Sequence, residues 1–317
     1  MLPAVAIAIG DPSGIGPEIS LKAALDPVAR AMCRPILVGD RGALEAHAKS
    51  CGLSLEGVEL IERKQLEPGE LRIGEIRPAH GRATLDSTKT AVRAALSGKV
   101  QAVVAAPHNE SAIHQAGIEF DGYPSFVARL CGLQAEDGIL MLCFQHDGRE
   151  IRIAHVTLHT SVATALTLIT AERVARTIRE VAGTLRKLGI DRPRLAISGV
   201  NPHAGENGLF GDEEAIRLAP ALSEARAAGI AVDGPIGADL LIQKKGYDAF
   251  IVMLHDQGHI PAKLLAPQRV AGMTIGTPVI FSSVAHGSAH DIAGKNQASH
   301  GAMLEAIARV TGRGVAA

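Results

Sequence analysis

The stretch AFIVMLHDQGHIPAKLL (249–265) joins a continuous apolar run to a polar segment, with a histidine at the junction. Its first six residues are typical of a strand that is buried on both faces of a sheet. Comparable apolar runs recur along the chain. They are AVAIAI (4–9), PILVG (35–39), AVVAAP (102–107), ILMLCF (139–144), IRIAHVTL (151–158), RLAISGV (194–200) and PVIFSSV (278–284).

Longer amphipathic segments separate these runs. Residues 168–189 space their apolar side chains by three and four and end on a glycine, which predicts a helix with a glycine C-cap. Residues 212–229 begin with Asp-Glu-Glu, which is favourable at a helix N-terminus, and also end on a glycine. The alternation predicts an α/β fold with largely parallel sheets and helices on both faces.

The length of 317 residues fits two such domains, at roughly 100–200 residues per domain. Strand-like segments adjoin glycine-rich segments near 125–135 and near 280–290. We therefore expect a discontinuous first α/β domain, residues 1–128 plus 285–317, and a second α/β domain, residues 129–284.

The composition excludes several classes of partner. Lys and Arg total 32 against 33 Asp and Glu, so no net charge draws the chain to nucleic acid or to an anionic membrane. Aromatic residues make up only 3% and there is no Trp, which counts against base-stacking surfaces. The apolar runs are too short for a transmembrane helix, and MLPAVAIAIGDPSG (1–14) predicts a strand in place of a signal peptide. Four scattered cysteines favour reduced thiols and a cytoplasmic location.

The positions of the histidines are informative. Ligands of open α/β sheets collect beyond the carboxyl ends of the strands. Four of the 13 histidines lie just past a predicted strand: His159, His203, His255 and His286. Three neutral imidazoles with an open coordination position would bind a catalytic divalent metal, Zn²⁺ first and Co²⁺, Ni²⁺ or Mn²⁺ as alternatives. The alternative is that each satisfies a local backbone hydrogen bond. Four others carry no such pattern and are expected at the surface: His47, His80, His146 and His300.

The residues around His255 add two further candidates. Asp256 is placed to accept the second ring N–H of a metal-ligating histidine. Lys263 lies eight residues after His255, just over two turns if the segment is helical, and so returns to the same face. It would bind a substrate anion or act as an acid or base; a solvated helix face is the alternative.

Three glycine-rich loops follow predicted strands. GDPSGIGPEI (10–19) lacks the G-x-G-x-x-G spacing of dinucleotide sites and predicts a tight strand-to-helix turn. VNPHAGENGLFGDEE (200–214) is long and polar, as expected of a site loop that leads into a helix. HGSAHDIAG (286–294) offers backbone N–H groups and Asp291 to a nucleotide.

Six motifs occur in the order found in the 4-hydroxythreonine-4-phosphate dehydrogenase family, which the chain resembles. They are GDPSGIGPEI, PHNESAIHQAG, NPHAGENGLFG, GPIGAD, MLHDQGHIPAK and HGSAHDIAGK. The last is also similar to the nucleotide loop of isocitrate and isopropylmalate dehydrogenases. The resemblance implies their two-domain fold with the active site in the interdomain cleft. It also implies NAD, or NADP as the alternative, and a divalent metal.

The resemblance also implies roles for particular residues. The metal ligands would be His159, His203 and His255, with His255 contributed across the interface of a homodimer by the second domain. Asp239 matches an aspartate near the reacting centre, and Lys263 is retained from the substrate-binding set. The nucleotide-contacting residues would be His286, Gly287, Ser288, Ala289, Asp291 and Gly294, while His290 and Asp291 are candidates for reading the ribose.

The chain departs from this family at its phosphate site. Gly122-Tyr123-Pro124 stands where the family has Gly-His-Thr, and Gly272 and Phe281 replace an Asn and an Arg. A Phe cannot supply the bidentate phosphate contact of an arginine. Ala285 replaces an acidic residue. Tyr123 and Phe281 would pack on a flat substrate ring, or else belong to the core.

PHNESAIHQAGIEFDGYPS, LHDQGHIPAKLLAP and SSVAHGSAHDIAG resemble the terephthalate dihydrodiol dehydrogenase branch. This implies NAD-linked oxidation of the dihydrodiol dicarboxylate with β-decarboxylation to protocatechuate. Arg129 and Arg269 are candidates for binding the distal carboxylate. The alternatives are a dehydrogenase acting on 4-hydroxythreonine 4-phosphate or a four-carbon phosphosugar acid, a non-catalytic binding protein, and a metal-dependent hydrolase or isomerase.

Overall fold

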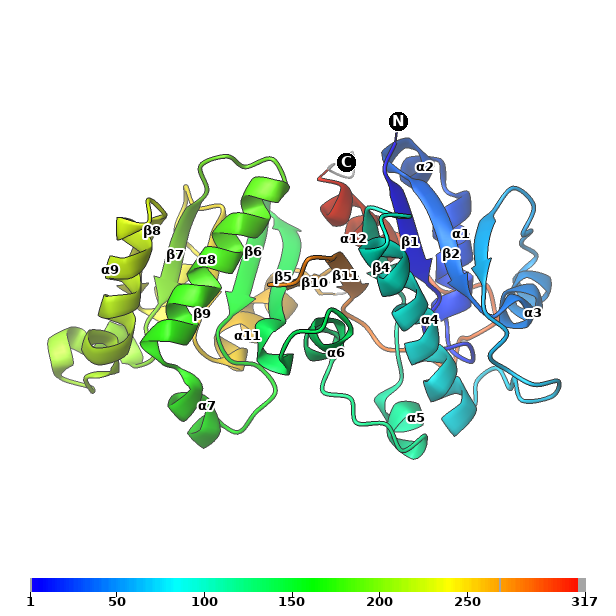
Figure 1. The fold of residues 1–317 in the computed structure, drawn as a ribbon, viewed down its shortest axis with the longest axis horizontal. Coiled ribbons are helices and arrows are strands. Elements are labelled where there is room, and N and C mark those ends of the chain that lie inside the picture. The colour runs from blue at the N-terminus through cyan, green and yellow to red at the C-terminus, as the bar shows by residue number, and fades with distance from the viewer. Residues whose placement is uncertain (1, 268, 313–317) are drawn as a thin grey trace. The chain divides into compact units, whose positions relative to one another are not determined.

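The computed structural model describes residues 2–267 and 269–312, which form two compact units (Figure 1). The first unit comprises the described residues up to Ala135 and from Thr277 onward, and the second comprises Glu136–Gly276. The sequence placed these boundaries at 128/129 and at 284/285. The junction after Gly276 precedes β11 (Ile280–Val284) because this strand pairs in parallel with β4 (Ala102–Ala105) of the first unit.

The sheet of the first unit is parallel, with the strand order β3-β2-β1-β4-β11. Every residue of β1 is buried, as expected of a strand covered on both faces. The remaining bounds are β1 (Ala4–Ala8), β2 (Arg34–Gly39) and β3 (Glu59–Glu62).

Helices cover both faces of this sheet. Ala4, Ala6 and Ala8 share a core cluster with residues of α4 and α6, while the intervening Val5 and Ile7 are fully buried on the opposite face. The helices of the first unit are α1 (Gly16–Leu25), α2 (Pro27–Met32), α3 (Arg41–Cys51), α4 (Pro78–Leu96), α5 (Glu110–Gln115), α6 (Tyr123–Leu130) and α12 (Gly301–Thr311).

The second unit has the strand order β10-β5-β6-β9-β7-β8. Its β10–β5 and β5–β6 pairs are antiparallel, and the rest are parallel. The β5–β6 hairpin turns at Asp147-Gly148, where both φ angles are positive, as a two-residue turn of type I′ requires. The bounds are β5 (Ile139–His146), β6 (Arg149–His155), β7 (Arg194–Ser198), β8 (Ala231–Ile236), β9 (Ala249–Val252) and β10 (Ala271–Ile275).

The two helices predicted in the second unit, over 168–189 and 212–229, are present, and both start later than predicted. The helix α8 is followed by Gly189 at φ +91°, so its glycine cap is confirmed. The predicted helix over 212–229 begins instead as a π-helical turn, η3 (Glu214–Leu218), which continues into α9. The other bounds are α7 (Val162–Leu168), α8 (Ala171–Lys187), α9 (Ala219–Ala227), α10 (Ala238–Leu241), α11 (His255–Leu265), and the 3₁₀ segments η1 (Ala135–Asp137) and η2 (Pro202–Gly208).

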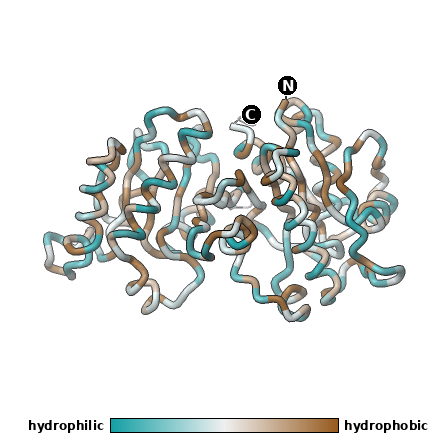
Figure 2. Tube along the Cα trace, in the orientation of Figure 1, coloured by the Kyte–Doolittle hydropathy of each residue, from teal (hydrophilic) through white to brown (hydrophobic). Residues whose placement is uncertain are grey.

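In Figure 2 hydrophobic residues follow the strands inside each unit, and hydrophilic residues are concentrated in the outer loops and helix faces. All four cysteines are free thiols. Within residues 2–267 and 269–312, every helix is too short or too polar to cross a bilayer.

Candidate active site

Three adjacent strands of the second unit each lead directly into a histidine-bearing segment. His159 follows β6, His255 begins α11 just after β9, and His203 lies in η2 just after β7. β6, β9 and β7 are neighbours and parallel, so their carboxyl ends lie at one edge of the sheet. The predicted location of these histidines beyond strand ends is therefore confirmed.

His255 is held in a defined orientation at the start of α11. Its Nδ1 lies 2.7 Å from the carboxylate of Asp256, as expected from the sequence, which leaves Nε2 as the nitrogen for another ligand. The rings of His159 and His255 lie 5.7 Å apart, centroid to centroid. Two of the three proposed ligands are therefore near one another within one chain.

His203 occupies an unusual backbone segment. His203, Ala204, Glu206 and Asn207 all have φ between 43° and 56°, with glycines at the two remaining positions up to Gly208. Left-handed conformation costs a non-glycine residue about 1–2 kcal/mol, so contacts from outside the segment must hold it. Its imidazole is exposed, with its ring 6.5 Å from that of Phe210. Among the described residues, no three His, Cys, Asp or Glu side chains are grouped to hold a metal. The donor types fit a divalent metal, but this chain alone does not bring three of them together.

Two further histidines extend the pair into a row. His259 stacks on His255 at 3.8 Å, and His155 lies 4.8 Å from His259, centroid to centroid. Burial lowers the pKa of His155 to about 3, and burial together with the neighbouring His255 lowers the pKa of His259 to about 4. Both rings are therefore neutral at pH 7. Sequence reasoning missed them, although His259 follows His255 at the i+4 spacing that places both on one helix face.

Glycine at position 258 is required by this row. Any Cβ there would collide with the His155 ring, which is 3% exposed and whose Nε2 has no hydrogen-bond partner among the described atoms. The close approach of α11 to β6 thus depends on a residue without a side chain.

Lys263 and Asp239 both lie in the second unit. The predicted helix is present, so His255, His259 and Lys263 follow one another at intervals of four along α11. Asp239 is exposed in the first turn of α10. A Cβ at Gly237 would lie 2.7 Å from the Asp239 carboxylate and 3.5 Å from the His203 backbone, so Asp239 and the His203 segment are neighbours.

A cavity of about 630 Å³ lies between α10, α11 and the β5–β6 turn. Asp239, Asp256 and Gln257 line it together with apolar residues of α11. Two of these, Ile260 and Leu264, are 55% and 74% exposed. The helix that begins with His255 therefore presents an apolar face.

The predicted nucleotide loop belongs to the first unit and is attached to the turn after β1. The Ile15 N–H donates to the Ser288 carbonyl at 2.8 Å, and a Cβ at Gly14 would lie 2.6 Å from Ser288. The Ser288 hydroxyl is buried and has no partner among the described residues. Around it, the structure leaves the other proposed nucleotide contacts partly or fully exposed: His286, Gly287, Ala289, Asp291 and Gly294.

A buried aspartate joins these two loops. Asp11 is 1% exposed, and its carboxylate lies 2.8 Å from His290 Nε2 and accepts from the Ser13 hydroxyl at 2.8 Å. Burial opposes ionisation of Asp11, but the hydrogen bonds from His290 and Ser13 hold its pKa below the usual value. The same contact raises the pKa of His290. The sequence predicted only a tight turn here, and Asp11 was missed because one acidic residue in a turn is a weak signal.

Tyr123 and Phe281 lie in the core of the first unit. They are 4% and 0% exposed, their rings are 5.2 Å apart, and both pack against β1 and β4 residues. We therefore correct the expectation that they pack on substrate: the core role is the one that their burial supports. Gly272 lies in β10, opposite Leu142 of β5.

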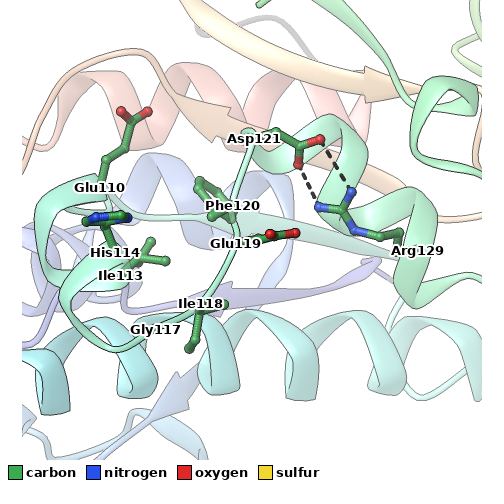
Figure 3. Close-up of a pocket in the computed structure, with 9 residues that line it drawn as sticks. All are labelled: Glu110, Ile113, His114, Gly117, Ile118, Glu119, Phe120, Asp121 and Arg129. Atoms are coloured by element: carbon green, nitrogen blue, oxygen red, sulfur yellow. Dashed lines mark hydrogen bonds and ion pairs between the residues drawn. The ribbon is translucent and has the colours of Figure 1, made fainter.

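A second cavity, of about 830 Å³, lies in the first unit beside α5 and α6 (Figure 3). Arg129 was a candidate for the distal carboxylate, and it lines this cavity. Figure 3 shows its guanidinium directed at Asp121, with the closest atoms 2.6 Å apart. A ligand carboxylate at Arg129 would have to displace Asp121.

Two histidines expected at the surface are fully buried. His47 makes a hydrogen bond with the Pro12 carbonyl, and His80 with the carbonyls of Glu70 and Glu75. The expectation was wrong because both histidines lie on the buried faces of helices, where backbone carbonyls of neighbouring loops contact Nε2 of His47 and both ring nitrogens of His80.

Comparison with known proteins places these features in context. A family model described as "Pyridoxal phosphate biosynthetic protein PdxA" matches residues 31–310. A 1,2-dihydroxy-3,5-cyclohexadiene-1,4-dicarboxylate dehydrogenase of Comamonas sp is 44% identical over 308 residues, covering 96% of each chain.

Solved structures give the same picture. A terephthalate 1,2-cis-dihydrodiol dehydrogenase from Burkholderia xenovorans LB400 is 40% identical, with a TM-score of 0.73 over 98% of each chain. A 4-hydroxythreonine-4-phosphate dehydrogenase from Burkholderia phymatum is 34% identical, with a TM-score of 0.83 over 98% of each chain. A β-decarboxylating dehydrogenase from Thermococcus kodakarensis shares the fold alone, at 17% identity and a TM-score of 0.52 over 96% of this chain and 82% of that one. The predicted fold class is therefore confirmed.

Proposed function

The chain belongs to the PdxA family, and from that premise we propose that it oxidises terephthalate cis-dihydrodiol with NAD⁺. Membership makes it a dehydrogenase, an NAD(P)-dependent oxidative decarboxylating enzyme that acts on a small molecule. The finer assignment draws its support from the 44% identity to a relative named for this dihydrodiol and from the residues that replace the phosphate site.

The proposed substrate is 1,2-dihydroxy-3,5-cyclohexadiene-1,4-dicarboxylate. Its secondary carbinol carbon would lose a hydride to NAD⁺ and its hydroxyl a proton, giving a β-keto acid. That acid would lose CO₂ from the neighbouring carbon. The ring then becomes aromatic as protocatechuate, which adds driving force to the decarboxylation.

One observation carries the choice of substrate. The position where the phosphate-binding members are expected to carry an arginine is held by Phe281, which is 0% exposed in the core. A buried phenyl ring offers no charge to a phosphate ester, and Gly272 offers no side chain. Lys263 is the member of the expected substrate-binding set that remains, and as a point charge it lacks the bidentate geometry that an arginine would offer a phosphate.

PdxA-family dehydrogenases use a divalent metal, and we propose that His159, His203 and His255 hold it here, with Zn²⁺ as the first choice. When bound, the metal would lower the pKa of the substrate hydroxyl and polarise the carbonyl that replaces it. Asp256 holds His255 through Nδ1 and so presents Nε2 as the donor. Lys263 would bind a substrate carboxylate or deliver a proton, and Asp239 would accept the hydroxyl proton.

The nucleotide would be held by the loop over 286–294. Its backbone course is supported by the contact of Ser288 with Ile15 and by the Asp11–His290 ion pair. The buried Ser288 hydroxyl, which lacks a partner among the described residues, is a donor or acceptor available to a ligand. NAD is the first choice and NADP the alternative.

A homodimer would complete the site, with His255 supplied by the second subunit. One feature of the described residues supports this proposal: α11 presents exposed Ile260 and Leu264 beside His255. Apolar residues exposed on the same helix as a proposed ligand are typical of an interface that a partner covers.

The deciding experiment follows absorbance at 340 nm with purified protein, Zn²⁺ and NAD⁺. Terephthalate cis-dihydrodiol and 4-hydroxythreonine 4-phosphate are offered in parallel. We expect NADH and protocatechuate from the dihydrodiol alone. Turnover of the phosphate ester alone would contradict the proposal and would mean that cations other than an arginine at position 281 bind phosphate.

A further inference from the structure

Glu214 opens the π-helical turn η3, and its side chain folds back onto the segment that carries His203. Its Oε1 accepts hydrogen bonds from the backbone N–H groups of Val200 and Asn201, each at 2.8 Å. Its Oε2 accepts from Asn201 Nδ2 at 3.0 Å. With 8% exposure, the carboxylate replaces water as the partner of these amides.

Two glycines make room for this carboxylate. A Cβ at Gly199 would lie 3.0 Å from Oε1, and a Cβ at Gly205 would lie 2.8 Å from Oε2. The carboxylate therefore fills the space between the end of β7 and the middle of the left-handed segment. It lies beside the backbone that precedes His203, at Gly199, and beside the backbone that follows it, at Gly205.

The electrostatics agree with this anchoring role. Burial would raise the pKa of Glu214, but the hydrogen bonds from Asn201 and Val200 hold it below the usual value, so the group is ionised at pH 7. Charged acceptors make stronger hydrogen bonds than neutral ones. Neighbouring Glu213 accepts from Asn201 Nδ2 at 2.7 Å, and this side-chain hydrogen bond is the largest cause of its lowered pKa.

We propose that Glu214 is the positioning residue for His203: it does not touch the metal but fixes the backbone that presents this imidazole. The inference rests on the proposed metal site. Partners that orient a metal ligand typically change metal affinity by about 10–100-fold when removed. Because the segment has φ values that non-glycine residues adopt rarely, it has no local preference for this shape once the anchor is lost.

The test compares Glu214→Gln with Glu206→Gln in the full-length chain. Both remove one charge, but Glu206 lies exposed in the same segment. Co²⁺ is titrated against a competing chelator, read by its visible absorbance, and the melting temperature of the metal-free protein is measured in parallel. We expect E214Q to bind Co²⁺ about 10–100-fold more weakly than the wild type and E206Q to match it, with metal-free melting temperatures within a few degrees. Equal affinity of E214Q and E206Q overturns the proposal.

Two further variants keep the outcomes separate. If E214Q does not fold, Glu214→Asp retains the charge on a shorter arm, and wild-type Co²⁺ affinity in E214D overturns the inference. His203→Ala is the reference. Loss of Co²⁺ in H203A with wild-type affinity in E214Q removes this inference alone, whereas wild-type affinity in H203A removes the proposed ligand set and this inference with it.

Discussion

The proposed nucleotide loop and the proposed metal ligands are built in opposite ways. In the first unit, Asp11 and Ile15 fasten the loop over 286–294 through contacts made within one chain. In the second unit, His159 and His255 are near one another, but no third ligand joins them among the described residues. The nucleotide side is thus preformed by tertiary contacts, whereas the proposed metal ligands are not gathered by contacts within the described residues of one chain.

The largest expected effect concerns the proposed metal ligands. His203→Ala and His255→Ala should each lose metal retention and turnover together, by a factor of at least about 10³, because each removes a proposed metal ligand. If the sites are shared between subunits, mixing the two inactive variants restores activity. Random exchange makes half of the dimers mixed, each with one intact site of two, so about a quarter of the wild-type activity returns.

The control for this mixing is the pair His203→Ala with His159→Ala. Both residues are assigned to the same subunit of a site, so each site of a mixed dimer lacks one of the two ligands and no activity should return. A separate control is His114→Ala, which changes an exposed residue of α5 and should leave metal content and turnover unchanged. An active, metal-free H203A protein would disprove the metal assignment.

The next largest effect concerns the contacts that hold the proposed nucleotide loop. Asp11→Asn removes the charge that pairs with His290 in a buried position, so we expect a loss of roughly 3 kcal/mol in the free energy of unfolding. The KM for NAD⁺ should rise because the loop loses its anchor. Denaturant titration and initial-rate kinetics give the two quantities.

The matched comparison is Asp121→Asn, which breaks the exposed pair with Arg129 seen in Figure 3. Exposed pairs contribute about 0–1 kcal/mol, so D121N should barely change stability. Equal losses of stability in D11N and D121N would show that burial of Asp11 does not strengthen its ion pair with His290.

The smallest effect is a difference in pH dependence. Burial holds the pKa of His155 near 3, so from pH 6.5 downward the unfolded chain binds a proton that the folded chain does not, and stability falls. At pH 5 the loss is about 2 kcal/mol. His290 has the opposite pH dependence. Asp11 raises its pKa, so its contribution to the free energy of unfolding is complete below pH 6.5 and is lost as the pH rises through the raised pKa.

Urea titrations of the EDTA-treated protein at pH 5 and 7 measure the first slope. In His155→Asn the difference between the two pH values should shrink by about 2 kcal/mol relative to the wild type. Parallel stability curves for the variant and the wild type would show that His155 accepts a proton in the folded state.

The sequence identifies the location of the candidate site better than its details. Strands with continuous apolar runs were predictable, and the histidines just past them lie where parallel strands end. β3, β8 and β10 were not predicted, because β3 and β8 carry charged residues and β10 is short and contains glycine. A local sequence pattern cannot show that such a segment forms a strand, because its hydrogen bonds come from neighbouring strands that are distant in sequence.

Side-chain partners across the fold were beyond the reach of sequence patterns. Asp11 meets His290 only because the chain returns to the turn after β1, and Glu214 turns back to β7 although its sequence predicted an ordinary helix start. Tyr123 and Phe281 were placed in the substrate site or the core with equal justification, because an aromatic residue suits both. Burial alone separates those two roles.

The contact between Gly14 and Ser288 also constrains how this chain can evolve. Because a methyl group at position 14 would collide with the backbone carbonyl and Cβ of residue 288, which almost every amino acid has, position 14 is restricted to glycine as long as the loop keeps this course. A lineage that gains a side chain at 14 must first reroute the distant loop, and a lineage that reshapes the loop is released from glycine. Loss of glycine at position 14 should therefore accompany a change in the path of the loop over 286–294, and a simple exchange of the residue at 288 would not permit it.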